Sequence, residues 1–294
     1  MLPVLQPASH PPPFERIAIV GLGLIGGSLA LAIRRKWSGG LIIAVDRKDV
    51  LEAGMRMHAA DVSADDPGMI AGADLVVLAA PVRQNIAFLR QLPDLLDGEA
   101  LITDVGSTKG EIADAARQLP GHLTFIGGHP LAGAARGGLA AARAELFDGR
   151  PWLLTTPAPE PALRRLETLF RGVGASPLRM GAGDHDRLLA SLSHLPQLTV
   201  SALMHVVGER AGGEGLALAG RGLRDTTRLA SSPPEIWTDI AATNAPAIRE
   251  ALDSLIDVLQ RLRDDLTGGD DLRRIFESAA AWKQRLEGSG LEPR

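Results

Sequence analysis

The stretch from Arg16 to Asp46 decides the fold of this chain. It reads RIAIV (16–20), then GLGLIGGSLALAIRR (21–35) and, after a short connection, LIIAVD (41–46). The two runs rich in Ile and Val predict buried parallel strands, and the segment between them predicts a helix that begins inside the glycine pattern. This order predicts a Rossmann-type unit, which binds a dinucleotide.

Each glycine of the pattern has a separate task. We expect Gly21 to allow the tight turn, Gly23 to let the backbone approach a pyrophosphate, and Gly26 to let helix and strand pack closely. The free N–H groups at the helix start, where Leu24 and Ile25 lie, then face the phosphates.

An acidic residue completes the unit. Asp46 follows the second strand, where a carboxylate accepts hydrogen bonds from the ribose 2′-hydroxyl. It favours NAD over NADP as cofactor because it would repel a 2′-phosphate. The neighbouring Arg47 could accept that phosphate, so the preference for NAD need not be strict.

Composition narrows the class of protein. The 294 residues are 45% hydrophobic and 22% charged, as in a soluble globular protein large enough for two domains. The net charge of −4 gives no field that would gather nucleic acid or an anionic membrane. There is no cysteine, no signal peptide, no HExxH motif and no clustered acidic box. We therefore expect a cytoplasmic protein with no metal, no nucleic-acid partner and no membrane partner.

The expected secondary structure changes near residue 183. Before it, strands alternate with helices, which indicates an α/β fold with a mainly parallel sheet. Further strands are expected at 74–80, 100–104, 123–126, 152–155 and 176–180, and helices at 50–57, from 108 and at 160–171. After it, only helices are expected. The predicted parts are a disordered arm (1–13), a Rossmann domain (14–182) and an all-α domain (183–294).

Ligands of parallel sheets bind at the carboxyl ends of the strands. Pro81, Val82, Ser107 and His129 each follow an expected strand, so they should lie on the same rim as the glycine loop. His129 is the best candidate for the group that takes a proton while hydride leaves. Ser107 could hold the reacting oxygen, cap a helix, or do both.

A long helix is expected from Asp184 to Val206, bent at Pro196. Its sides are apolar, so it should be buried, except for a polar stripe at every fourth residue: Ser193, Gln197, Ser201 and His205. We interpret the stripe as a pocket wall rather than as satisfied core polar groups, and His194 lies on the same helix. His185, flanked by acids at the helix start, is interpreted as a surface or capping residue.

Two further patterns lie in the helical half. Arg224 and Arg228 are four residues apart, so a helix would place both on one face, where they could bind an anionic substrate or pair with acids such as Asp225. A heptad-like seam comprises Ile248, Leu252, Leu255, Leu259, Leu262 and Leu266. It suits either an intrachain bundle or a subunit interface, and the layout of the two domains favours a homodimer.

Five motifs together resemble the prephenate dehydrogenase family of tyrosine biosynthesis. They are GLGLIGGSLA (21–30), DVGSTKG (104–110), GGHPLAG (127–133), SHLP (193–196) and RDTTRLASSPPEIWTDIAATN (224–244). The resemblance implies a Rossmann domain, a helical dimerisation domain and NAD-dependent oxidative decarboxylation of prephenate to 4-hydroxyphenylpyruvate.

The resemblance also implies roles for individual residues. His129 would accept a hydrogen bond from the substrate's C4 hydroxyl, Ser107 would assist it, and Arg228 would anchor a substrate carboxylate. Ser193 and His194 would line the same cleft.

The chain departs from the family pattern at two places. Many members that use prephenate have a second histidine after SHLP, where this chain has Gln197. An amide can donate or accept, so both prephenate and arogenate stay open as substrates. Some members carry a glutamate shortly after HPxAG, where this chain has Ala135 and Arg136, which leaves feedback by tyrosine open.

Two rival functions are compatible with a Rossmann domain followed by helices. β-Hydroxyacid dehydrogenases share this layout, but they generally use a lysine base, and the striped helix contains no lysine. A non-catalytic NAD-binding sensor would give no reason for His129 or Arg228.

Overall fold

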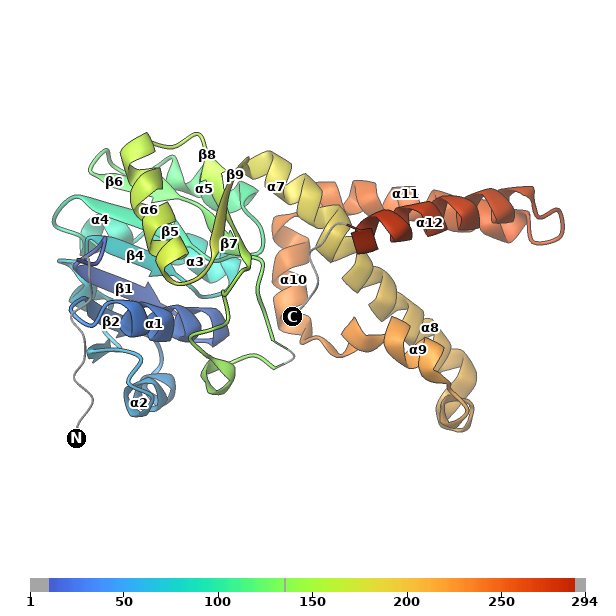
Figure 1. Ribbon diagram of the computed structural model, residues 1–294, viewed down its shortest axis with the longest axis horizontal. Coiled ribbons are helices and arrows are strands. Elements are labelled where there is room, and N and C mark those ends of the chain that lie inside the picture. The colour runs from blue at the N-terminus through green and yellow to red at the C-terminus, as the bar shows by residue number, and fades with distance from the viewer. Residues whose placement is uncertain (1–10, 135, 289–294) are drawn as a thin grey trace. The chain divides into compact units, whose positions relative to one another are not determined.

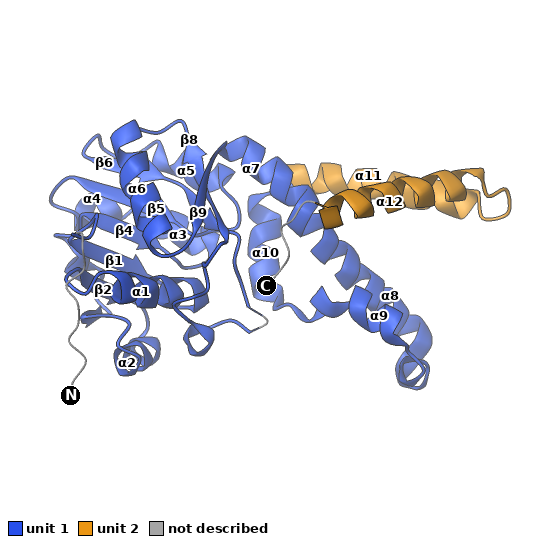
Figure 2. Ribbon diagram, viewed as in Figure 1, with its two compact units in different colours: residues 1–245 blue, residues 246–294 orange. Residues whose placement is uncertain are grey.

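The computed structural model describes residues 11–134 and 136–288. The chain divides into two compact units, residues 1–245 and 246–294, and each unit is described by itself (Figure 2). Most of the predicted arm, residues 1–13, lies outside the described residues, as does Ala135. The expected domain boundary at 182–183 stays a prediction.

The first unit contains a six-stranded sheet that is parallel throughout, with the order β3-β2-β1-β4-β5-β6 (Figure 1). The strands are β1 (Arg16–Val20), β2 (Leu41–Val45), β3 (Val62–Ala64), β4 (Leu75–Leu78), β5 (Ala100–Asp104) and β6 (Leu123–Ile126). The predicted parallel sheet is confirmed, although the short strand β3 was not expected. The strand order reverses between β1 and β4, and a ligand binds at such a switch point.

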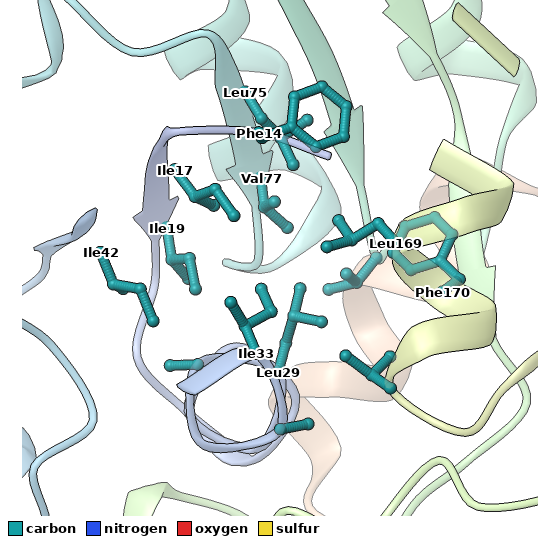
Figure 3. Packing of buried hydrophobic residues seen from close by; sticks show 14 of the residues in the cluster. Phe14, Ile17, Ile19, Leu29, Ile33, Ile42, Leu75, Val77, Leu169 and Phe170 are labelled. Carbon is teal, nitrogen blue, oxygen red and sulfur yellow. The ribbon is translucent and has the colours of Figure 1, made fainter. Parts of the chain in front are cut away.

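Helices cover both faces of this sheet. They are α1 (Leu24–Lys36), α2 (Lys48–Arg56), α3 (Val82–Leu89), α4 (Leu92–Leu95), α5 (Gly110–Ala116) and α6 (Glu160–Gly172), with 3₁₀ turns at Pro67–Ile70 and Leu139–Ala141. Because side chains alternate along a strand, Ile17 and Ile19 pack with the side chains of α1 and α6 (Figure 3), whereas Ala18 and Val20 face the cluster that contains α3.

A second, three-stranded sheet carries His129. It consists of β7 (Gly128–Pro130), β8 (Pro151–Thr156) and β9 (Ser176–Gly181) in the order β7-β8-β9. The strands expected near 152–155 and 176–180 therefore exist, but they do not extend the large sheet. β7 runs antiparallel to β8 and places His129 opposite Leu153, so His129 lies on a strand and not in an open loop.

The expected helix from Asp184 to Val206 is wrong in three details. Helix α7 (Ala182–Leu189) begins earlier, with Gly181 at its cap, and Asp184 pairs with Arg187. A π-helical segment (Ala190–His194) precedes Pro196, because proline lacks an N–H group and crowds the carbonyl four residues earlier. Helix α8 (Leu195–Ala217) then continues past Val206, with non-helical backbone at Gly212.

The expectation that this helix is buried holds for its first part, where His185, Asp186, Leu189, Ala190 and His194 are buried, and fails for α8 in the single chain. Gln197 is the only buried side chain of α8, and Leu203 and Val206 are exposed. The apolar surface of α8 is therefore open in the single chain.

The expected helix that carries both arginines is interrupted. Helix α9 (Arg221–Thr226) ends before Arg228, which begins a 3₁₀ turn (Arg228–Ser231), and α10 (Pro234–Thr243) follows. Arg224 and Arg228 therefore do not share one helical face.

The second unit holds α11 (Ala245–Asp264) from Pro246 onward, and α12 (Asp270–Gly288). Asp265 accepts hydrogen bonds from the N–H groups of Asp271 and Leu272 and so caps α12. Among the described residues, no helix combines the length and apolar character that a membrane crossing needs.

Candidate active site

The glycine loop has the geometry that a dinucleotide needs. Gly21 has φ +97°, and a Cβ there would lie 2.7 Å from the backbone of Ala79 and Ala80. A Cβ on Gly26 would lie 2.0 Å from the carbonyl oxygen of Gly21, so only glycine lets the helix approach the turn. No described atom lies within 4 Å of a Cβ built on Gly23, which leaves its backbone open to a ligand.

Asp46 is oriented by two backbone donors. Its Oδ2 accepts the N–H of Leu22 at 2.6 Å and its Oδ1 accepts the N–H of Arg47 at 2.6 Å. The carboxylate is half-buried beside the glycine loop and keeps lone pairs for ribose hydroxyls. The Arg47 guanidinium is exposed and lies 3.5 Å from Asp49.

A buried asparagine that the sequence analysis missed holds the neighbouring loop. Asn85 of α3 donates to the carbonyl oxygen of Leu78 and accepts the N–H of Ala80, both at 3.1 Å. It thereby fixes the loop after β4, which packs against Gly21 and leads into Pro81 and Val82. An asparagine within the apolar pattern of 82–89 was the available signal.

Ser107 is not a helix cap. Helix α5 begins at Gly110 rather than at Thr108, because Asp186 of α7 accepts the N–H groups of Lys109 and Gly110, both at 2.7 Å. This distant carboxylate performs the capping that was one of the roles considered for Ser107, whose side chain is half-buried.

His129 belongs to a hydrogen-bonded chain. Its Nδ1 lies 2.9 Å from Nε2 of His185, and Nδ1 of His185 lies 2.8 Å from Oδ1 of Asp186. His185 is fully buried, so its interpretation as a surface residue is wrong. The neighbouring acids suggested solvent exposure, whereas one of them, Asp186, is itself mostly buried.

The chain of contacts assigns the protons. The Asp186 carboxylate accepts, so Nδ1 of His185 is the donor, and in the neutral ring Nε2 of His185 is the acceptor. Nδ1 of His129 must then donate, which leaves Nε2 of His129 with a free lone pair. Within the described residues that Nε2 makes no hydrogen bond and can take a proton from a ligand.

Electrostatics keep this imidazole neutral. Burial is the main reason that the pKa of His129 lies well below its ordinary value of 6.5. Coulombic interactions with the nearby basic groups His185, Lys109 and His194 lower this pKa further. His129 is therefore a base that stays unprotonated at neutral pH.

A second buried histidine presents a donor. Asn244 donates to the carbonyl oxygen of Asp186 at 2.8 Å, and its Nδ2 lies 3.3 Å from Nδ1 of His194. Burial lowers the pKa of His194 to about 4, so its ring is neutral with the proton on Nε2. That buried N–H has no hydrogen-bond partner in the part of the chain described. Because buried polar groups are nearly always hydrogen-bonded, we expect this N–H to donate to a group of a bound ligand.

Gln197 differs from the expectation for the polar stripe. Its amide donates to the Leu229 carbonyl at 2.8 Å and to Ser201 at 3.2 Å, and its Oε1 accepts the Ser232 hydroxyl at 3.1 Å. Gln197 is therefore a satisfied buried polar group that fastens the segment next to Arg228. Of the other members, Ser193 and Ser201 are half-buried and His205 is exposed.

The structure thus connects most of the predicted residues within the first unit. His129 is linked through α7 and Asn244 to His194, and Gln197 lies three residues after His194, on α8. Thr108 also contacts Thr243 of α10 at 2.7 Å, which joins the loop of Ser107 to the helical segment. The Arg228 guanidinium is exposed and makes no ion pair with a described residue.

Comparisons with known proteins show the family of the chain. Residues 29–178 match the family model described as prephenate dehydrogenase, nucleotide-binding domain, and residues 181–278 match prephenate dehydrogenase, dimerization domain. The chain is 35% identical to a prephenate dehydrogenase of Bacillus subtilis, over 92% of this chain and 76% of that protein.

Two solved structures share the fold over almost their whole length. A Synechocystis arogenate dehydrogenase has 30% sequence identity and a TM-score of 0.78, over 92% of this chain and 99% of that one. The prephenate dehydrogenase from A. aeolicus, in complex with hydroxyphenyl propionate and NAD+, has 26% identity and a TM-score of 0.86, over 92% and 98%. With matches to both family models and a dinucleotide loop in place, the chain belongs to the prephenate dehydrogenase family of NAD-dependent dehydrogenases.

Proposed function

We propose that this protein oxidises prephenate with NAD to 4-hydroxyphenylpyruvate, CO2 and NADH, in tyrosine biosynthesis and in the cytoplasm. The observation that carries the proposal is the hydrogen-bonded chain from Nδ1 of His129 through His185 to Asp186, which leaves Nε2 of His129 available to accept a proton. A neutral imidazole in a domain that also carries a dinucleotide loop suits the oxidation of a carbinol, because such a group must release a proton as it loses hydride.

The residues of the chain divide the remaining work. Nε2 of His129 accepts the C4 hydroxyl proton as the C4 hydrogen departs, and Ser107 holds the same oxygen. The ring carboxylate leaves as CO2, its bonding electrons complete the aromatic ring, and the proton returns to the phenol oxygen. Since aromatisation drives the reaction, the protein chiefly orients and polarises the substrate.

The cofactor supplies the hydride acceptor when it is bound. The backbone of Gly21, Gly23 and Gly26 and the first helical N–H groups, at Leu24 and Ile25, would hold its pyrophosphate. Asp46 would hold the ribose, with Arg47, Pro81 and Val82 beside it. The open backbone at Gly23 and the oriented carboxylate of Asp46 fit these roles.

Arg228 would bind a substrate carboxylate, with Ser193 and His194 along the same wall. Its exposed guanidinium supports this, since no described acid neutralises it. The Nε2–H of His194 offers a further donor. Gln197 would hold the Arg228 segment in place, because its amide already has three partners.

A substrate and cofactor matrix tests the proposal. NADH or NADPH formation is followed for prephenate and arogenate, each with NAD and NADP. We expect prephenate with NAD to give the highest kcat/KM and one CO2 for each NADH. Faster turnover of arogenate would transfer the assignment to that substrate, and tight NADH binding without turnover of either would favour the sensor.

We further propose that the protein is a homodimer. Large apolar side chains are exposed in the single chain, among them Leu192, Val206, Leu259, Phe276 and Trp282. Light scattering should give twice the chain mass of 31.0 kDa. A 31.0 kDa particle at micromolar concentration would contradict the dimer.

A further inference from the structure

A buried ion pair lies between the loops that carry Ser107 and His129. Asp104 ends β5 and Lys109 precedes α5, and both side chains are 0% exposed. Nζ of Lys109 pairs with Oδ2 of Asp104. Removing two charges from water costs so much free energy that a protein is often as stable with well-packed apolar residues of the same volume in place of a buried ion pair. The pair is therefore better explained by the positions that it sets.

The carboxylate of Asp104 contacts both loops. Its Oδ2 accepts the N–H of Gly106 at 2.8 Å, and its Oδ1 accepts the N–H of Gly128 at 3.1 Å. Gly106 immediately precedes Ser107, and Gly128 immediately precedes His129. One planar group therefore ties both loops to the end of β5.

Three glycines leave this pair little room to shift. A Cβ on Gly106 would lie 2.8 Å from Oδ2 of Asp104, and one on Gly127 would lie 3.2 Å from Cδ of Lys109. A Cβ on Gly128 would lie 2.5 Å from the carbonyl oxygen of Asp104. The backbone of both loops thus packs directly on the ion pair.

The pair also closes a ring of contacts that contains the proposed base. From Asp104 the ring runs through Lys109, Asp186, His185, His129 and Gly128 back to Asp104. Each step is a hydrogen bond, an ion pair or a peptide bond. A change at Asp104 would therefore move the imidazole as well as the serine.

We propose that Asp104, neutralised by Lys109, is a positioning residue that sets the separation between the Ser107 hydroxyl and the His129 imidazole. The inference rests on the proposed function, in which these two side chains hold the same substrate oxygen. It assigns Asp104 no contact with the substrate.

The test compares Asp104→Asn and Lys109→Met with the double variant that carries both. Each single change leaves one buried charge without its partner, so both single variants should unfold at lower temperature. In the double variant neither of the two buried side chains carries a charge, so this variant should fold. The two glycine N–H groups bond to different oxygens of Asp104, and in the amide an NH2 group replaces one of these oxygens, so one glycine N–H loses its acceptor.

We expect the double variant to have a kcat about 10- to 100-fold below wild type, because a displacement of about 1 Å has effects of this size. The KM for prephenate should change by less than about threefold, since the residues proposed to bind its carboxylates are untouched. A folded double variant with wild-type kcat would overturn the proposal, because a purely structural pair is replaceable. A fall in kcat that is matched by a rise in KM would overturn it too.

A matched control removes an ion pair elsewhere. Glu167 on α6 is mostly buried and lies 2.6 Å from Arg179, and neither residue contacts the ring. Glu167→Gln should lower the unfolding temperature and leave kcat unchanged. If it lowered kcat as much as the double variant does, the loss would reflect general destabilisation.

A second readout does not depend on turnover. Amide hydrogen exchange at Gly106 and Gly128 should be slow in the wild type, and at least one of the two should exchange faster in the double variant. Unchanged exchange at both would overturn the proposal even if prephenate were not the substrate. If the wild-type protein did not turn over prephenate, the proposed function would be contradicted, but the exchange measurement would still test the role of Asp104.

Discussion

His129 owes its state to two residues that need not touch a substrate. If both tautomers of His129 were populated, the nitrogen facing the substrate would be protonated in part of the molecules and could not accept a proton. The bond from Nδ1 of His129 to His185, itself bonded to Asp186, removes that choice. The same contacts orient the ring, so the geometry of the base depends on α7.

This dependence gives a prediction for His185→Asn. The shorter amide cannot span from His129 to Asp186, so kcat should fall about 10- to 100-fold while the KM for prephenate stays nearly constant. Steady-state kinetics check this. His122→Asn is the control, because His122 is exposed in the loop before β6. Equal kcat for the His185 variant and the control would show that His129 needs no support.

The pH dependence of kcat/KM follows from the lowered pKa of His129. The base works in its neutral form, and it is protonated only below its pKa. A pKa held well below 6.5 therefore keeps the base active as the pH falls past 6.5. The acid limb of the pH–rate profile should lie below that value. A limb centred above pH 6.5 that disappears in His129→Asn would contradict the assignment.

At this scale the sequence indicated His129 but not its partners. A strand end and two glycines mark His129 by local pattern alone. The burial of His185 is set by packing far along the chain, and two flanking acids suggested the opposite. Asp186 likewise caps α5 across 76 residues, and no local pattern predicts such a contact.

At the scale of the elements, helix α2 ends in a motif that has a histidine where glycine is usual. His58 has φ 54°, and the N–H groups of His58 and Ala59 bond to the carbonyls of Met55 and Gly54, as in a Schellman motif. Glycine adopts this conformation without the steric cost that a Cβ imposes.

We expect His58→Gly to raise the free energy of unfolding by about 0.5–1 kcal/mol, because it relieves this cost. Denaturant titration measures it. His58→Ala is the control, since it removes the imidazole and keeps the Cβ, and it should give no such gain. Equal stability of the two variants would show that the positive φ carries no strain.

The local sequence pattern predicted the existence of the helices and strands well, but it predicted their ends less well. β1, β2 and α1 follow directly from apolar runs and glycines. The π-helical segment before Pro196 and the break between Arg224 and Arg228 do not, because both depend on how backbone groups find partners in three dimensions. The exposure of α8 also escaped prediction, since an apolar helix looks the same whether its own chain or another one covers it.

For the whole molecule, the family assignment joins two matched domains, and the proposed reaction needs groups from both halves of the sequence. The base lies on β7, its supporting residues lie on α7, and the proposed anchor Arg228 follows α9. Hydrogen bonds from His129 through Asp186 and Asn244 to His194 connect these parts. This chain of contacts supports one site built from residues more than 100 positions apart.

The most direct measurement compares kcat and KM for His129→Asn and Arg228→Ala with prephenate and NAD. Loss of the base should lower kcat by about 10²-fold or more with KM nearly unchanged. Loss of the anchor should mainly raise KM, by about 2–4 kcal/mol when expressed as binding free energy. If His129→Asn changed only KM and Arg228→Ala only kcat, the roles would be reversed and the account would be contradicted.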